Sequence, residues 1–170
     1  MTLPTYLTLL IDYHTWATER SLAEAAALSP AQYFQPQSHS WGSVHALLVH
    51  TFDAEWIWLR RCQGESPRVM PGADAYPDLP TLRAAWTEHL AALRRYLAAL
   101  TPAELQAELS YTNTQGRPYR LARWQILVHL TNHATHHRGE LAAMFTQLGA
   151  PHGEDDLLFY LLQVTGQKRV

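Results

Sequence analysis

The sequence predicts an all-α fold: a four-helix bundle with a long crossover connection, a small β-hairpin before the last long helix and a short C-terminal helix. Three observations support this class. Alanine and leucine dominate a chain of 170 residues that is 47% hydrophobic, whereas glycine is sparse at 8 residues. Apolar residues recur three or four positions apart over four long segments, and turn-forming residues separate these segments. A chain of this length is predicted to form a single domain, 1–170.

The first long helix is predicted over residues 4–28, where the apolar positions follow a helical period. It ends at the sequence LSPAQ. Ser29 is a good N-cap, Pro30 suits the first helical position and Gln32 completes a capping-box pattern. A short turn of helix is therefore expected directly after the first long helix.

The second long helix is predicted to begin between Ser40 and Ser43 and to end at Cys62. The connector that follows carries residues that break regular structure, namely Gly64, Pro67, Pro71, Gly72 and Pro77. We expect an irregular crossover loop there. Asp78 then caps a third helix over 79–100, which ends at LTPAE, a second capping box.

A small β-hairpin is predicted between the third and last long helices, because Leu109 and Tyr111 alternate with polar residues before a glycine-containing turn. The last long helix is expected over 123–148 and stops at Gly149. A shorter helix over 154–162 closes the chain.

Composition excludes several classes of function. The formal charge of −2 and the absence of a long basic run predict no binding to nucleic acid. No stretch approaches about 18 uninterrupted apolar residues, so no membrane span is expected. We therefore predict a soluble, cytoplasmic protein. The single cysteine, Cys62, is expected to be a packing residue.

Four of the ten histidines, His129, His133, His136 and His137, fall within nine residues of the last long helix. On a helical wheel centred on His133, His129 and His137 lie on the same face and His136 lies at its edge. That face also carries apolar residues, so we expect it to face the core. Several imidazoles on one apolar face favour a bound metal ion, because unpartnered buried polar groups are costly. The alternative is that each histidine is separately hydrogen-bonded or reaches solvent.

Helical spacing does not rank these histidines, since His129 and His133, like His133 and His137, are four residues apart and can clamp one metal ion. A third ligand is expected from another helix. His50 on the second helix shares a face with apolar residues and is the best candidate. The remaining histidines are expected to be structural, exposed or in connectors: His14, His39, His45, His89 and His152.

Three segments resemble the DinB/YfiT family of small metal-binding four-helix-bundle proteins, which is unrelated to the DNA polymerase sharing the first name. They are NHATHHRGEL (132–141), SVHALLVHTFDAEWIWLRR (43–61) and DYHTWATERSL (12–22). Helix order, crossover position and length also agree. The sequence departs from the family pattern at Glu140, where glutamine is usual, and at Thr18, where asparagine is frequent.

The resemblance implies that His50, His133 and His137 bind one divalent metal ion. It leaves His136 as a residue beside the ligands or at an interface. Glu140, one turn from His137, is expected to hydrogen-bond a ligand imidazole or to coordinate the ion itself. Arg138 is expected to pair with Glu140 or to hold an anionic substrate.

Three neutral histidines leave a coordination position for water or substrate, which is typical of a catalytic site. Zinc or nickel suits imidazole best, whereas iron or manganese would gain from Glu140. The resemblance implies a transferase, isomerase or hydrolase-type reaction on a small thiol or thiol adduct, and a homodimer. The alternative is a non-catalytic metal-binding or stress-response protein in which the metal is structural.

No competing catalytic motif is present: the sequence lacks a phosphate-binding glycine-rich loop, Gly-x-Ser-x-Gly, Cys-x-x-Cys and paired Glu-x-x-His motifs. The six tryptophans are expected in the core or at an interface. Four arginines are expected on solvated helix ends and faces: Arg60, Arg61, Arg94 and Arg95.

Overall fold

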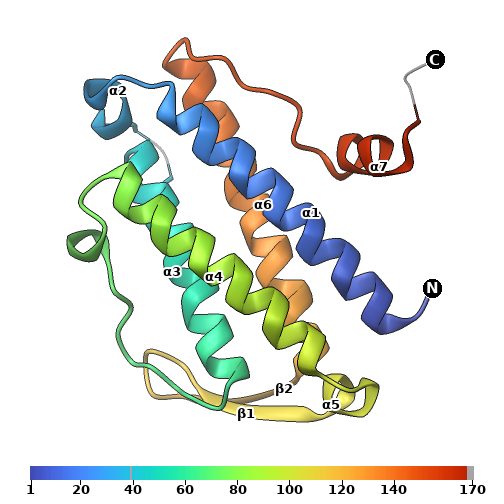
Figure 1. Ribbon diagram of the computed structural model, residues 1–170. Coiled ribbons are helices and arrows are strands. Elements are labelled where there is room, and N and C mark those ends of the chain that lie inside the picture. The colour runs from blue at the N-terminus through green and yellow to red at the C-terminus, as the bar shows by residue number, and fades with distance from the viewer. Residues whose placement is uncertain (39, 168–170) are drawn as a thin grey trace.

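The protein is a bundle of four long helices that run side by side, as the computed structural model shows for residues 1–38 and 40–167 (Figure 1). These helices are α1 (Leu3–Ala26), α3 (Val44–Cys62), α4 (Leu79–Ala99) and α6 (Arg123–Gln147). Helix α6 packs against both α1 and α3, and α4 packs against the same two helices. The predicted bundle is confirmed.

Short helices follow both predicted capping boxes. Helix α2 (Pro30–Phe34) begins after Ser29, whose hydroxyl accepts a hydrogen bond from the Gln32 backbone N–H, while the Gln32 side chain accepts one from the Ser29 N–H. Helix α5 (Pro102–Gln106) repeats this arrangement with Thr101 and Glu104. These reciprocal bonds satisfy backbone donors that a helix start leaves free, so local sequence sets where both helices begin.

The crossover between α3 and α4 is irregular except for one turn of 3-10 helix, η1 (Ala73–Ala75), which the sequence did not indicate. Two hydrogen bonds attach this connector to α3. The Asp53 carboxylate accepts one from the Gly72 N–H at 3.0 Å, and the His45 Nε2 bonds the Tyr76 carbonyl at 2.8 Å. The turn forms because α3 supplies partners for its backbone.

The predicted hairpin consists of the antiparallel strands β1 (Glu108–Thr112) and β2 (Pro118–Ala122). Leu109 and Tyr111 are buried, so alternate residues of β1 face the bundle. Helix α7 (Leu157–Thr165) starts three residues later than predicted, because the Asp156 side chain caps it by accepting a hydrogen bond from the Leu158 N–H. It lies beside α1 (Figure 1).

The core divides into two apolar clusters along the length of the bundle. One contains Phe52, Trp86 and Phe145, and the other contains Leu93 and Ile126.

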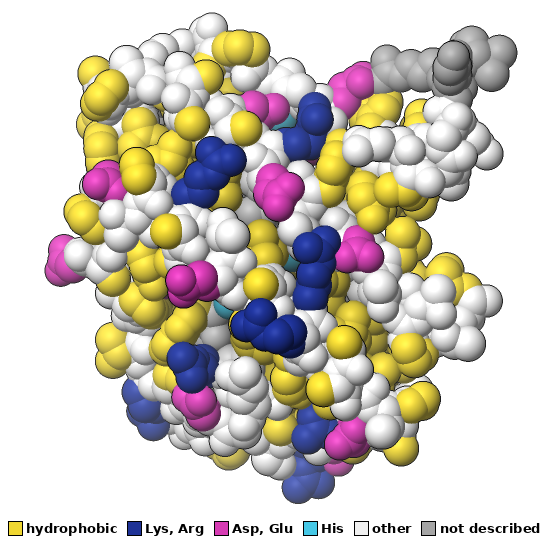
Figure 2. Space-filling view, in the orientation of Figure 1, with side chains coloured by type: hydrophobic (Ala, Val, Ile, Leu, Met, Phe, Trp, Pro, Cys, Tyr) yellow, Lys and Arg dark blue, Asp and Glu magenta, His cyan; other side chains and the backbone are white. Residues whose placement is uncertain are grey.

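On the α1 and α4 face, acidic and basic side chains are interspersed with apolar ones (Figure 2). Among the described residues, no helix is long and apolar enough to cross a membrane. Cys62 is buried, which confirms its role as a packing residue.

Candidate metal centre

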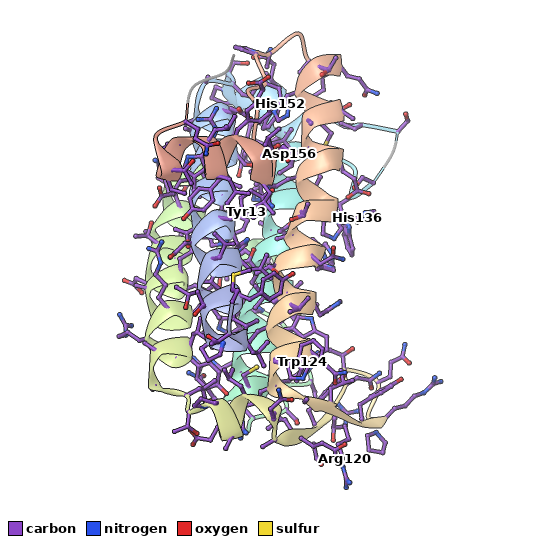
Figure 3. The ribbon with its side chains drawn as sticks, turned by 90° about the vertical axis from the view of Figure 1, so that its right-hand side faces the viewer. Tyr13, Arg120, Trp124, His136, His152 and Asp156 are labelled. Atoms are coloured by element: carbon purple, nitrogen blue, oxygen red, sulfur yellow. The ribbon has the colours of Figure 1, made fainter. Side chains whose placement is uncertain are left out.

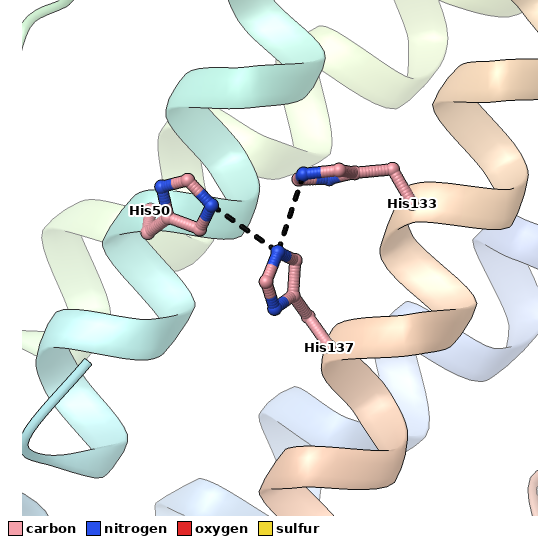
Figure 4. Close-up of side chains that lie close together, drawn as sticks. All are labelled: His50, His133 and His137. Atoms are coloured by element: carbon pink, nitrogen blue, oxygen red, sulfur yellow. Dashed lines mark hydrogen bonds between the residues drawn. The ribbon is translucent and has the colours of Figure 1, made fainter. Parts of the chain in front are cut away.

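Three histidines converge between α3 and α6 (Figure 4). The Nε2 atom of His137 lies 3.2 Å from that of His50 and 3.2 Å from that of His133. All three offer a nitrogen within 4.8 Å of the others, a spacing that could hold one metal ion. The structure thus brings together the three residues that the family resemblance selects.

Two neighbouring side chains fix the orientation of these imidazoles. The Nδ1 atom of His137 lies 2.6 Å from the Glu140 carboxylate, so this contact leaves the Nε2 atom directed at His50 and His133. The indole of Trp41 stacks on the imidazole of His50, with ring centroids 3.6 Å apart and planes 14° apart. A carboxylate is one of the common partners of the far nitrogen of a ligand histidine at metal sites. The sequence predicted the contact of Glu140 with a ligand imidazole but not the stacking of Trp41 on His50. The only indication of the latter in the sequence is that residue 41 is aromatic.

The environment keeps two of these imidazoles neutral. Burial, and then the proximity of neighbouring histidines, lowers the pKa of both His50 and His133 to about 4. Burial disfavours the charged form of Glu140, but the hydrogen bonds from His137 and Ser40 lower the pKa of its carboxyl overall. Neutral imidazoles beside a carboxylate are the protonation states that metal binding requires.

The other two clustered histidines lie on the surface. His129 is exposed and packs its ring edge against Trp58, with centroids 4.9 Å apart. His136 is exposed, and its Nε2 atom lies 3.7 Å from the Glu140 carboxylate. His136, His137 and Glu140 form a second group with ligand spacing, whereas His129 belongs to no such group among the residues described.

The prediction that His129, His133 and His137 lie on the core-facing stripe of the last helix, with His136 at its edge, holds for His137, in part for His133 and not for His129. Of the four, only His137 is buried, and His133 is partly buried. The buried stripe of α6 runs instead through Leu127, Leu130, Ala134 and Leu141. Because each residue turns the helix by about 100°, centring the wheel on His133 misplaced the stripe. The candidate ligands therefore lie at the border between core and solvent.

Arg138 points away from the candidate metal centre. Its guanidinium donates hydrogen bonds to the hydroxyls of Tyr13 and Thr135, and its Nε lies 3.6 Å from the Asp155 carboxylate. Figure 3 shows Tyr13 and His136 on opposite sides of α6. The expected pairing of Arg138 with Glu140 is therefore absent among the described contacts.

A buried polar cluster lies at mid-length of the bundle, and sequence reasoning missed its central residue, Glu55. The Glu55 carboxylate accepts a hydrogen bond from the Trp86 indole at 2.8 Å, and lies 3.2 Å from His14 and 3.7 Å from His89. Burial disfavours the charged carboxylate, but attraction to His14 and the hydrogen bonds lower the pKa of Glu55 overall. The available signal was an acidic residue inside the apolar run DAEWIWL.

The remaining histidines have individual partners. His14 and His89 are buried beside Glu55, and His45 is bonded to the crossover. The Nδ1 atom of His152 lies 2.9 Å from the Glu24 carboxylate. His39 lies outside the described residues.

The fold and these side chains define a four-helix-bundle protein with a candidate three-histidine metal centre between two long helices. The chain belongs to the DinB family, whose model matches residues 1–169. It is 24% identical over 170 residues to Protein DinB of Bacillus subtilis (strain 168), covering 94% of this chain and 95% of that protein. A solved DinB-like protein from Bacillus cereus ATCC 10987 shares the fold with a TM-score of 0.59 and 19% identity, over 85% of this chain and 94% of the other.

Proposed function

We propose that this protein binds one divalent metal ion through His50, His133 and His137 and uses it to act on a small thiol or thiol adduct. The observation that carries this proposal is the convergence of the three Nε2 atoms at the interface of α3 and α6. Imidazole donors favour zinc or nickel, and a contribution from Glu140 favours iron or manganese.

The surroundings of the three histidines support a reactive site more than a sealed one. His50 and His133 are only partly buried, so a ligand reaches them from solvent. Three protein ligands leave a position for substrate, where a bound metal supplies Lewis-acid activation and favours the thiolate form of a thiol. Glu140 holds the His137 imidazole, and Trp41 presents an apolar surface, 52% exposed, beside His50.

Metal content of the purified protein tests the ligand assignment. We expect one equivalent of zinc or nickel in the unmodified protein and loss of stoichiometric binding in His50→Ala, His133→Ala and His137→Ala. His129→Ala is the matched control, because this histidine is on the same helix one turn from His133 but outside the cluster. Equal metal content in all four variants contradicts the assignment.

Cobalt substitution tests the proposed chemistry. Addition of 2-mercaptoethanol to the cobalt-loaded protein is expected to produce a sulfur-to-metal charge-transfer band, because a thiol entering the open position loses its proton. A spectrum unchanged by thiol supports the alternative, in which the metal only stabilises the bundle or serves a stress response without catalysis.

We also propose a homodimer. Helix α7 is strongly apolar, yet none of its residues is buried, and Leu158 and Val164 are 57% and 55% exposed. An exposed apolar helix of this kind is typical of an association surface. Light scattering after gel filtration is expected to give twice the monomer mass of 19.3 kDa, and Leu158→Glu is expected to shift the protein to monomer.

A further inference from the structure

Two arginines are buried in the described part of the chain. Arg61, which the sequence wrongly predicted on a solvated helix, is 5% exposed and packs against the rings of Trp58 and Tyr111. Arg138 is 4% exposed and lines a cavity of about 320 Å³. A buried cation in the wall of a cavity has direct access to a ligand there.

This cavity lies between α1, α6 and the start of α7, on the opposite side of α6 from the candidate metal centre (Figure 3). Its volume is at the lower end of the range for ligand pockets, so it suits a small molecule. Solvent reaches it past Tyr6 and Asp156, which are both exposed. Apolar side chains line part of its wall, namely Leu10, Val128 and Leu157.

Neighbouring side chains hold the Arg138 guanidinium in place and leave part of it unsatisfied. Its Nη2 atom donates hydrogen bonds to the hydroxyls of Tyr13 at 3.2 Å and Thr135 at 2.6 Å, and its Nη1 atom lies 3.5 Å from the Nδ1 atom of His14. The Nε atom is buried and has no hydrogen-bond acceptor among the described residues. A buried donor without an acceptor costs free energy, so a ligand that supplies an acceptor is favoured.

The Asp155 carboxylate lies beside this unsatisfied donor. Its distance of 3.6 Å from the Arg138 Nε atom makes an ion pair but is too long for a hydrogen bond. The Asp155 side chain is 21% exposed and lines the same cavity. The cavity therefore presents a cation and an anion side by side.

We propose that this cavity binds a free α-amino acid with an apolar side chain, independently of the metal centre. The carboxylate of the amino acid accepts hydrogen bonds from Arg138 and its ammonium donates to Asp155, so that the four charges alternate. Arginine suits this role because its planar fork matches a carboxylate. The ammonium nitrogen and the carboxylate carbon of an α-amino acid are about 2.5 Å apart, a short spacing that matches two charged groups 3.6 Å apart. The apolar side chain packs against the wall that contains Leu10 and Val128.

Calorimetric titration of the purified protein with L-leucine, L-methionine and L-phenylalanine tests the proposal. We expect saturable binding of at least one of them, with one equivalent bound and a Kd below about 1 mM. The N-acetyl derivative of that amino acid lacks the ammonium, and its amide lacks the carboxylate. Each is expected to bind at least about tenfold more weakly, since it loses a charge-assisted hydrogen bond.

Two variants assign the charges to the two residues. Asp155→Asn is expected to lose the preference for the amino acid over its N-acetyl derivative and to keep the preference over the amide. Arg138→Gln is expected to lose the preference over the amide instead. A merely structural role would weaken the binding of all three compounds alike. Arg94→Gln and Asp12→Asn, at an ion pair on the surface, are the matched controls and are expected to bind like the unmodified protein.

An α-amino acid also chelates metal ions, so the titration is repeated after removal of metal with EDTA and dialysis. We expect equal affinity before and after. Binding that disappears with the metal overturns the cavity site, and so does the absence of saturable binding of all three amino acids. Equal affinity for the amino acid and both derivatives, or unchanged preferences in both Asp155→Asn and Arg138→Gln, also overturns it. If Arg138→Gln does not fold, Asp155→Asn alone decides the question.

Discussion

The indole N–H of Trp86 donates a hydrogen bond of 2.8 Å to the Glu55 carboxylate, at a position where Glu55 is only 1% exposed. The two residues come from α4 and α3, and His14 of α1 lies 3.2 Å from the same carboxylate oxygen. This polar contact lies between the two apolar clusters of the core. It joins three of the four long helices at one point.

Glu55→Ala is expected to destabilise the fold by about 3–5 kcal/mol, since it removes the acceptor of a buried hydrogen bond and the partner of two buried histidines. The free energy of unfolding from urea titration measures this. Glu65→Ala is the control, because Glu65 pairs with Arg60 in solvent and its loss is expected to cost less than about 1 kcal/mol. Similar losses in the two variants contradict a structural role for the buried carboxylate.

Asp53→Asn is expected to stabilise the protein at neutral pH. Burial raises the pKa of the Asp53 carboxyl to about 6, although a hydrogen bond from Gly72 opposes this. Between the ordinary pKa of about 4 and this raised value, the folded state binds the proton more tightly than the unfolded chain, so stability falls as the pH rises. The asparagine retains an acceptor for Gly72 and does not ionise.

The expected difference in unfolding free energy between Asp53→Asn and the unmodified protein grows by about 2–3 kcal/mol from pH 4 to pH 7. Urea titrations across this range measure it, and other titrating groups cancel in the difference. Asp12→Asn is the control, at a 38% exposed side chain paired with Arg94. If the difference in unfolding free energy between Asp53→Asn and the unmodified protein is constant, or shrinks as the pH rises, the pKa of Asp53 is not raised.

Glu140→Gln is expected to lower metal affinity by 10- to 100-fold without changing the stoichiometry, because the carboxylate orients His137 through its Nδ1 atom at 2.6 Å. Competition with a chromophoric chelator measures the affinity. Glu65→Gln, at an exposed carboxylate paired with Arg60, is the control. Unchanged affinity in Glu140→Gln shows that His137 is held by the helix alone, and complete loss of binding indicates that Glu140 is itself a ligand.

Trp41→Ala is expected to weaken metal binding by about 2- to 10-fold, because the stacked indole orders the His50 imidazole and an aromatic pair contributes about 0.5–1.5 kcal/mol. Trp41→Phe keeps a ring against His50 and is expected to retain most of the affinity. Calorimetric titration with zinc distinguishes the two. Equal weakening by alanine and phenylalanine shows that the indole acts in some other way.

The sequence by itself determined the features that depend on residues close together in the chain. Ser29 with Gln32 and Thr101 with Glu104 set the starts of two helices, and their hydrogen bonds form within the same turn. The alternation at Leu109 and Tyr111 identified the inward face of the hairpin. The helical bundle followed from apolar periodicity in the same way, because each long helix carries its own pattern.

Tertiary structure alone decided how each helix is rotated about its axis. It also decided which residues contact the side chains at the border between core and solvent. Local spacing treated His129 and His137 alike, but packing of α6 against α3 brings His137 to His50 and leaves His129 on the surface. The same packing buries Arg61 between rings from a helix and a hairpin. Helix rotation depends on the summed contacts of every facing residue, and a difference of one residue turns a side chain by about 100°. No short motif carries that information.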